Sequence, residues 1–161
     1  MNPRRILISG GGSGIGAELS ALLAATGHEI IVTDVDGGAA TRVADAIASS
    51  GGKVTGLALD VTRTAAVETA VRAAGQVEVL INNAGLQHVA RLEQFPADRW
   101  AFLVAVMLTG AANMARAVLP GMRERNFGRI VNIGSIHSLV ASPFKSAYVS
   151  AKHGLIGLSK T

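Results

Sequence analysis

The sequence predicts an α/β protein in which one parallel sheet is covered by helices on both faces. Short apolar runs of strand length alternate with longer segments that suit helices throughout the 161 residues. The short runs are continuously apolar, as in strands buried on both faces. The first run leads directly into a glycine-rich turn and then a helix. A chain of this length forms one domain with a substantial core, and we take residues 1–161 as that domain.

Five strands are expected, each lying between segments that favour helix or turn. They are Ile6–Ile8, Glu29–Thr33, Val54–Leu59, Val77–Ile81 and Gly128–Gly134. The expected helices run over Ala17–Ala25, over Gly38–Ser49, from a cap at Thr62 to about Ala74, from Pro96 to about Glu124 with a bend near Pro120, and onward from about Ser146. This alternation is typical of a doubly wound sheet.

The composition narrows the class of protein. Hydrophobic residues make up 49% of the chain and charged residues 16%, which indicates a globular protein rather than a disordered one. The formal net charge is +4, but the basic residues are scattered, so we expect no nucleic-acid partner. The absence of cysteine excludes disulfides and thiolate metal sites, and no metal site is expected.

Two segments bear on the location of the protein. Arg4-Arg5 leads straight into an apolar strand without a long apolar region, so no secretory signal is expected. Ala101–Leu119 is largely apolar and nearly long enough to span a membrane. It contains Asn113 and Arg116, and a buried helix of an α/β protein explains it better. We therefore expect no membrane partner and a cytoplasmic protein.

The glycine-rich turn after the first strand has the context of a dinucleotide site. Gly10 and Gly12 allow a tight turn, Gly14 lets backbone N–H groups approach a pyrophosphate, and Gly16 lets the helix pack on the strand. The N-terminus of that helix directs unpaired N–H groups at the phosphates. A flexible loop is the alternative, and the strand–turn–helix order makes it the weaker one. The residues expected to bind cofactor here are Gly10, Gly12, Ser13, Gly14, Ile15 and Gly16.

A carboxylate at the end of the second strand indicates which dinucleotide binds. Asp34 lies roughly 20 residues beyond the glycine turn, where it can accept hydrogen bonds from both ribose hydroxyls and repel a 2′-phosphate. No Arg or Lys stands at Ser13 or Val35 to neutralise such a phosphate. NAD is therefore favoured over NADP. The alternative role, capping the next helix, suits Asp36 better.

The third and fourth strands end in polar groups at the same edge of the sheet. Asp60-Val61 follows the third strand and Asn82–Gly85 follows the fourth. Ligands of parallel α/β sheets bind beyond the carboxyl ends of the strands. We therefore add Asp60, Val61 and Asn83 to the expected cofactor-binding residues.

The stretch after the fifth strand contains the candidate catalytic residues Ser135, Tyr148 and Lys152. On a helix, Tyr148 and Lys152 lie on one face one turn apart. A nearby ammonium favours the phenolate form of a tyrosine, which makes it a better proton acceptor. Ser135 could hold the alcohol or carbonyl oxygen that Tyr148 serves. An ordinary surface helix is the alternative, since this spacing alone is a weak signal.

Together these residues resemble the short-chain dehydrogenase/reductase family. The matching elements are S-G-G-G-S-G-I-G, Asp34, Asp60-Val61, N-N-A-G, Ser135 and Y-V-S-A-K, in this order over essentially the whole chain. The resemblance implies a Rossmann-type sheet, a nicotinamide cofactor and Ser-Tyr-Lys catalysis. It also implies a homo-oligomer that pairs subunits through the long helix and the Tyr helix.

Within that family the chain is most similar to the bacterial D-3-hydroxybutyrate dehydrogenases. The similar segments are Asn82–Val89 and Leu139–Gly154. The resemblance implies that Gln87, His137 and Lys145 bind the carboxylate and nearby groups of a small hydroxy acid, in the conversion of 3-hydroxybutyrate to acetoacetate. His137 could instead satisfy loop backbone, and Lys145 could be solvated. Another reductase of the family, such as one for 3-oxoacyl thioesters, is the second reading.

Two departures from the family support a different class of function. Relatives carry an Asn in the long helix that holds a water in a proton relay, and Met107 stands at that position. A thioether cannot donate a hydrogen bond. Relatives also continue with a sixth strand, a helical lid and a seventh strand, so the domain is expected to be truncated after the helix that follows strand five. A catalytically impaired nucleotide-binding fragment therefore stays open.

Overall fold

The computed structural model describes residues 2–161 and confirms the parallel sheet. Within these residues five strands pair in the order β3-β2-β1-β4-β5, all parallel. Their bounds are β1 Arg5–Ser9, β2 Glu29–Asp34, β3 Lys53–Ala58, β4 Val79–Asn82 and β5 Arg129–Asn132. The strand order reverses between β1 and β4, and a crevice forms at such a switch point beyond the carboxyl ends of the strands.

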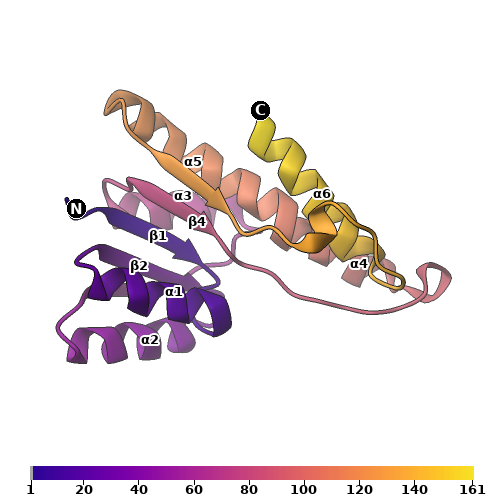
Figure 1. Ribbon diagram of the computed structural model, residues 1–161, viewed down its shortest axis with the longest axis horizontal. Coiled ribbons are helices and arrows are strands. Elements are labelled where there is room, and N and C mark those ends of the chain that lie inside the picture. The colour runs from indigo at the N-terminus through magenta and orange to yellow at the C-terminus, as the bar shows by residue number, and fades with distance from the viewer. Residues whose placement is uncertain (1) are drawn as a thin grey trace.

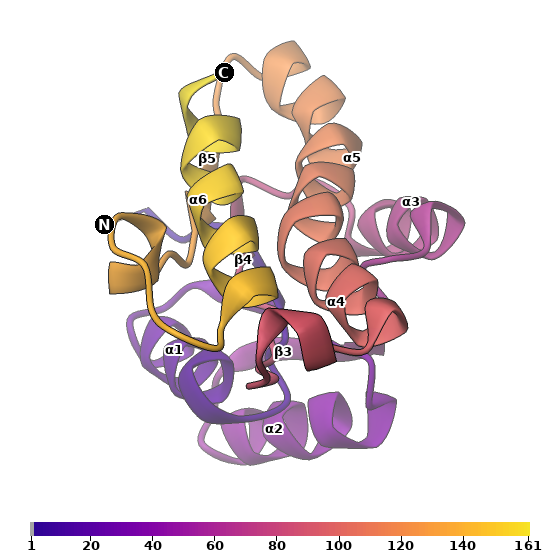
Figure 2. The same cartoon turned by 90° about the vertical axis from the view of Figure 1, so that its right-hand side faces the viewer.

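Helices cover both faces of the sheet (Figure 1). Helices α1 (Gly14–Ala25) and α2 (Gly37–Ser49) lie on one face, and α3 (Thr64–Ala74) and α5 (Gly110–Glu124) lie on the other. A shorter helix, α4 (Ala97–Val104), continues into α5 through a π-helical segment, Ala105–Thr109. The last helix, α6 (Ser146–Lys160), runs beside α4 and this π-helical segment (Figure 2).

The buried side chains of the strands alternate between two core layers. Ile6, Ile8 and Ile81 pack against α1 and α2, whereas Leu7 and Leu80 pack against α3 and α5. Successive side chains of a strand point to opposite faces, so a sheet covered on both faces needs apolar residues at every position. The continuous apolar runs of the sequence therefore fill both layers.

The structure corrects two expectations about helices. Thr62 does not cap α3, because Arg63 occupies that position and the Thr62 backbone N–H and hydroxyl both donate to Asp60 Oδ1, at 2.9 and 2.7 Å. The Asp60 carboxylate thus holds Thr62 in the turn that precedes the helix. The long helix is irregular at Ala105–Thr109, and α5 continues as α-helix through Pro120.

The segment Ala97–Glu124 passes a length and composition test for crossing a membrane. In the fold, however, Met114, Val118 and Met122 of this segment are buried against the sheet and α3. Its apolar composition is therefore that of a core helix.

Close packing at the junction of β1 and α1 depends on two glycines. A Cβ on Gly16 would lie 2.2 Å from the Gly10 carbonyl oxygen and 2.6 Å from Asn83 Nδ2. Gly10 has a φ of +63°, and a Cβ there would lie 2.7 Å from the Ala84 Cα. Side chains at either position would force strand and helix apart.

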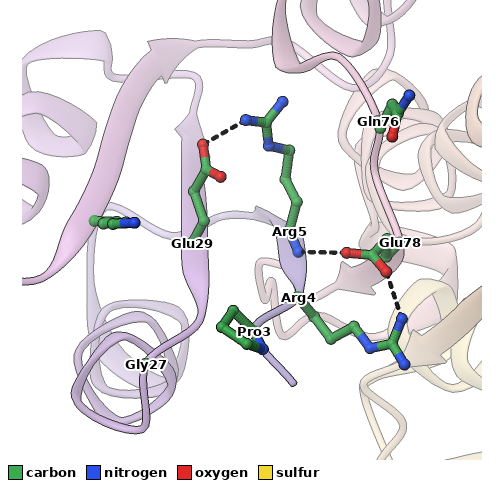
Figure 3. A pocket seen from close by; sticks show the side chains of 8 residues that line it. Pro3, Arg4, Arg5, Gly27, Glu29, Gln76 and Glu78 are labelled. Atoms are coloured by element: carbon green, nitrogen blue, oxygen red, sulfur yellow. Dashed lines mark hydrogen bonds and ion pairs between the residues drawn. The ribbon is translucent and has the colours of Figure 1, made fainter. Parts of the chain in front are cut away.

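Ion pairs link the amino ends of the strands, at the edge of the sheet away from the glycine turn (Figure 3). Arg4 pairs with Glu78 at 2.5 Å, and Arg5 pairs with Glu29 at 2.7 Å. The second Glu78 oxygen accepts the Arg5 backbone N–H at 3.1 Å. The hydrogen bond from Arg4 lowers the pKa of Glu78 below its ordinary value. These charges border a hollow of about 250 Å³ and are compensated within the chain.

Gly16→Ala tests the strand–helix contact. We expect the variant to lose about 2–4 kcal/mol of unfolding free energy, because the new methyl meets backbone that cannot move aside cheaply. Gly157→Ala on α6 is the matched control, since its Cβ would meet nothing within 4 Å and alanine favours helix. Thermal and urea unfolding give both values. Equal stability of the two variants would contradict the packing role.

Glu78→Gln tests the ion pair at the amino edge. A carboxyl whose pKa is lowered on folding stabilises the fold above its unfolded pKa of ~4.3, and this contribution disappears as the pH falls through the folded pKa. The variant should be less stable by about 1 kcal/mol at pH 7 and should approach the wild type below about pH 4. Glu93→Gln, at the exposed Arg91 pair of 3.8 Å, should change little at any pH. A pH-independent deficit for Glu78→Gln would refute the electrostatic origin.

Candidate active site

A cleft of about 510 Å³ opens beyond the carboxyl ends of the strands, at the switch point between β1 and β4. This volume falls within the range of cofactor and ligand sites. Its walls come from the turns after β1, β2, β3 and β4 and from α4 and the π-helical segment. The lining residues are Gly10, Ser13, Gly14, Ile15, Asp34, Val35, Leu59, Asp60, Val61, Asn83, Ala84, Gly85, Leu86, Phe102 and Val106.

Most of the residues expected to bind a cofactor line this cleft. They are Gly10, Ser13, Gly14, Ile15, Asp34, Asp60, Val61 and Asn83. Gly12 and Gly16 are not among the lining residues, and both are closely packed within the turn. Val35 and Phe102, which are 75% and 44% exposed, also line the cleft and were not among the residues expected to bind a cofactor. Because Val35 directly follows Asp34, the sequence could have placed it at the cleft. The place of Phe102 depends on how α4 is oriented, which the sequence does not show.

Asn83 holds the glycine turn against the end of β4. Its Nδ2 donates to the carbonyl oxygens of Ser9 at 3.1 Å and Gly10 at 2.8 Å. Its backbone N–H donates to the Ser9 hydroxyl oxygen at 3.2 Å. The side chain thus satisfies backbone carbonyls at a place where the turn leaves regular structure.

Asp34 is held at the edge of the cleft by two backbone groups. Its Oδ2 accepts the Gly12 N–H and its Oδ1 accepts the Asp36 N–H, each at 3.0 Å. A carboxylate has about four acceptor sites, so this one retains capacity for hydroxyl donors. Asp36 accepts the Ala39 N–H at 3.0 Å and caps α2, as the sequence indicated. None of the described residues lining the cleft is Lys or Arg.

The loop after β5 fixes the Ser135 side chain at the start of a short 3₁₀ turn, Ile136–Ser138. The Ser135 hydroxyl oxygen accepts the His137 N–H at 3.1 Å, and the Ser135 N–H donates to the Ser138 hydroxyl at 3.0 Å. These reciprocal bonds form a capping box. The orientation of the Ser135 hydroxyl is therefore determined by its own turn.

The first turns of α6 bring Tyr148 and Lys152 together beside that loop. The Lys152 Nζ lies 5.7 Å from the centroid of the Tyr148 ring and donates to the Ile133 carbonyl at 2.5 Å. Lys152 is only 5% exposed, and burial lowers its pKa below the ordinary value. The His137 ring stands edge-on to the Tyr148 ring, with 6.1 Å between centroids.

The other two residues expected at a substrate site lie on neighbouring loops. Lys145 immediately precedes α6, and Gln87 lies on the loop after β4. The Ala90 N–H donates to the Phe144 carbonyl at 2.9 Å and joins these loops. Gln87 is exposed, and its Oε1 accepts the His88 N–H within its own loop.

The loop also supports the alternative role considered for His137. Its Nδ1 lies 3.2 Å from the Val140 carbonyl oxygen, so the ring is engaged with loop backbone. The same ring also packs edge-on beside the Tyr148 ring.

Met107 lies at the centre of the π-helical segment and is 2% exposed. It lines a small cavity together with Lys152. The asparagine of the long helix is Asn113. Its side-chain amide donates to the Val61 carbonyl at 3.1 Å and so does not lie beside Lys152 in this cavity.

Comparison with known proteins agrees with this geometry. Residues 4–161 match the model of the family described as short chain dehydrogenase. The chain is 42% identical over 99% of its length to a D-beta-hydroxybutyrate dehydrogenase of Cupriavidus necator, and 39% identical over 96% of its length to one of Rhizobium meliloti. It covers 64% and 62% of these two relatives, so it spans less than two thirds of their length.

Solved structures share the fold. A gluconate 5-dehydrogenase from Burkholderia cenocepacia in complex with NADP and tartrate superposes with a TM-score of 0.94 at 35% identity, covering 99% of this chain and 64% of that one. A short chain dehydrogenase/reductase from Burkholderia phymatum in complex with NAD gives a TM-score of 0.95 at 32% identity, covering 99% and 58%. With a match over nearly its whole length and a fold shared with these structures, the chain belongs to the short chain dehydrogenase family.

Proposed function

We propose that the chain is the nucleotide-binding and catalytic part of an NAD-dependent oxidoreductase that acts on a small hydroxy acid. The pair best supported by the sequence is 3-hydroxybutyrate and acetoacetate. The observation that carries the proposal is that Tyr148 and buried Lys152 lie together on a helix packed against the turn that Ser135 begins. These three residues are not among those that line the cleft, which opens at the carboxyl ends of the strands.

The residues present fit a dinucleotide. Gly14 has a φ of +50°, and a Cβ added there would meet nothing within 4 Å, so its backbone is open to a ligand. The unpaired N–H groups at the start of α1 suit a pyrophosphate. Asp34 has acceptor capacity for ribose hydroxyls, and no described cation lines the cleft to receive a 2′-phosphate. These features favour NAD as the cofactor.

In the proposed mechanism, Tyr148 takes the proton of the substrate hydroxyl and returns it in the reverse direction. The Lys152 ammonium stabilises the negative charge that develops on the phenol oxygen. Ser135 donates to the substrate oxygen and positions it. A nicotinamide cofactor, when bound, supplies the acceptor or donor of the hydride.

Three residues carry the proposal for an acidic substrate. Lys145 can pair with a carboxylate, and Gln87 Nε2 can donate to it. His137 Nδ1 donates to the Val140 carbonyl, so in the neutral ring Nε2 is an acceptor, and it can donate to a carboxylate when the ring is protonated. The two relatives named D-beta-hydroxybutyrate dehydrogenase support this choice. A 3-oxoacyl thioester is the second candidate, because relatives named 3-oxoacyl-[acyl-carrier-protein] reductase are 31–32% identical.

A non-catalytic nucleotide-binding role is the candidate from another class. Met107 occupies the centre of the π-helical segment beside Lys152, and the chain covers only 64% of its first relative. A protein with this role would bind a nucleotide in the cleft but would not convert a substrate. The experiment below separates it from the oxidoreductase.

We also propose a cytoplasmic homo-oligomer. Two subunits would pair through α4, α5 and α6, which run side by side at one side of the molecule (Figure 2). The resemblance to the family supports this arrangement.

Tyr148→Phe tests the proposed proton transfer. NADH formation from 3-hydroxybutyrate, followed by its absorbance, should fall by about 10²–10⁴-fold, because phenylalanine cannot accept a proton. NAD should still raise the melting temperature of the variant. His153→Gln, an exposed substitution on the same helix, should leave turnover unchanged.

Normal turnover by Tyr148→Phe would disprove the mechanism. A wild-type chain that NAD stabilises but that never forms NADH from 3-hydroxybutyrate or consumes NADPH with a 3-oxoacyl thioester would support the non-catalytic role.

Asp34→Ala tests the choice of cofactor. Loss of a charged acceptor should weaken NAD binding by about tenfold to a hundredfold, and NADP binding by less, since NADP loses a repulsion as well. Calorimetric titration of both nucleotides measures the two effects. Asp36→Asn keeps a good helix cap and should leave NAD affinity unchanged. A greater loss for NADP than for NAD would exclude the ribose role.

A further inference from the structure

A small cavity of about 10 Å³ lies behind the candidate catalytic residues, between the end of β4, the π-helical segment and α6. It has about the volume that one water molecule needs. Most of its wall is apolar, and its polar side chains belong to Ser9, Asn82 and Lys152. The complete lining is Ser9, Val61, Asn82, Ala84, Val106, Met107, Gly110, Ala111, Lys152 and Leu155.

Asn82 brings an unpaired acceptor to this cavity. Its side chain is 7% exposed, and its Oδ1 has no hydrogen-bond partner among the described residues. Its Nδ2 donates to the Ala111 carbonyl at 3.3 Å and to Asn132 Oδ1 at 2.9 Å. A buried acceptor left without a donor costs about 1–3 kcal/mol, so a partner for this oxygen is expected.

The orientation of the Asn82 amide follows from its neighbours. The Ser159 hydroxyl donates its proton to the Leu155 carbonyl at 2.7 Å, so it accepts from Asn132 Nδ2 at 2.8 Å, and Asn132 presents its oxygen to Asn82. Both contacts of Asn82 Nδ2 are therefore acceptors, and exchanging the oxygen and nitrogen would break both. The oxygen is left facing away from them.

Lys152 brings spare donors to the same cavity. An ammonium has three N–H groups, and one of them is used by the Ile133 carbonyl at 2.5 Å. The group is buried, and no other residue that lines the cavity titrates. The nearest described ring is that of Tyr148 at 5.7 Å. A buried ammonium with unused donors favours an acceptor at this place.

Ser9 offers a third partner. Its hydroxyl oxygen accepts the backbone N–H groups of Asn83 and Ala84, each at 3.2 Å. The hydroxyl proton therefore remains available to donate. Met107, on another side, has only a thioether, which is a weak acceptor and no donor.

We propose that Asn82 is a positioning residue for Lys152, and that one bound water connects them. In this arrangement Lys152 Nζ and the Ser9 hydroxyl donate to the water oxygen, and the water donates to Asn82 Oδ1. The water supplies a donor to the buried acceptor and a second partner to the buried ammonium at once. It also holds the ammonium on the side of the cavity away from solvent, at the orientation in which Nζ lies over the Tyr148 ring.

The inference builds on the proposed role of Lys152, but its tests need neither substrate nor cofactor. The first test is the Lys152 pKa, measured by NMR of lysine labelled at Cε. Asn82→Asp places a carboxylate at the cavity and should raise that pKa by about one unit or more. Asn113→Asp is the matched control, since Asn113 is equally buried but donates to Val61 and does not line the cavity. It should move the pKa by much less.

A Lys152 pKa that is unchanged in Asn82→Asp, or raised equally by both variants, would overturn the proposal. A second test covers the case in which Asn82→Asp does not fold. A high-resolution crystal structure of the wild-type chain should contain a water within hydrogen-bond distance of Asn82 Oδ1 and Lys152 Nζ. An ordered cavity with no water between these atoms would also overturn it, whether or not the chain oxidises a hydroxy acid.

Discussion

The fold depends on the close approach of α1 to the end of β1. Gly16 lies against the Gly10 carbonyl so tightly that a methyl group would not fit, and Asn83 secures that carbonyl from the side of β4. This contact determines where α1 begins and where its unpaired N–H groups are directed. The same asparagine links the glycine turn to the neighbouring strand, so the geometry of that turn and the pairing of β1 with β4 are established together. A small change in this junction would therefore alter both the sheet and the cleft.

A second constraint is the burial of an ammonium without a carboxylate partner among the residues that surround it. Such a group is costly unless hydrogen bonds satisfy it, and its pKa falls as a result. Lys152 has a backbone carbonyl at 2.5 Å and an aromatic ring nearby, while the apolar side chains of Met107 and Leu155 exclude solvent. A site of low polarity strengthens the interaction of this charge with a developing phenolate. The features that make Lys152 costly to bury are thus those that suit it to the role proposed for it.

The positions of residues that depend on short stretches of chain could be predicted from the sequence. The positions of residues that depend on helix packing could not. Asp34 and the glycine turn were located correctly because they end or follow a strand, and parallel strands end at one edge. Thr62 was wrongly taken as a cap, since the sequence does not reveal that its hydroxyl donates back to Asp60 and that the helix begins one residue later than expected, after Arg63. Phe102 and the π-helical segment depend on how the long helix lies over the cleft and α6.

The two edges of the sheet explain why the candidate site lies where it does. At the amino edge, Glu29 and Glu78 are each paired with an arginine, so the charges there are neutralised within the chain. At the carboxyl edge, Asp34 accepts only backbone N–H groups and keeps acceptor capacity, while α1 directs its N-terminal end there. The proposed dinucleotide would meet both requirements of this edge, with its phosphates at the helix and its hydroxyls at the carboxylate. The amino edge offers neither, although it also contains a hollow of about 250 Å³. The chemistry left unsatisfied at the carboxyl ends of the strands therefore distinguishes the candidate site from the hollow at the amino edge.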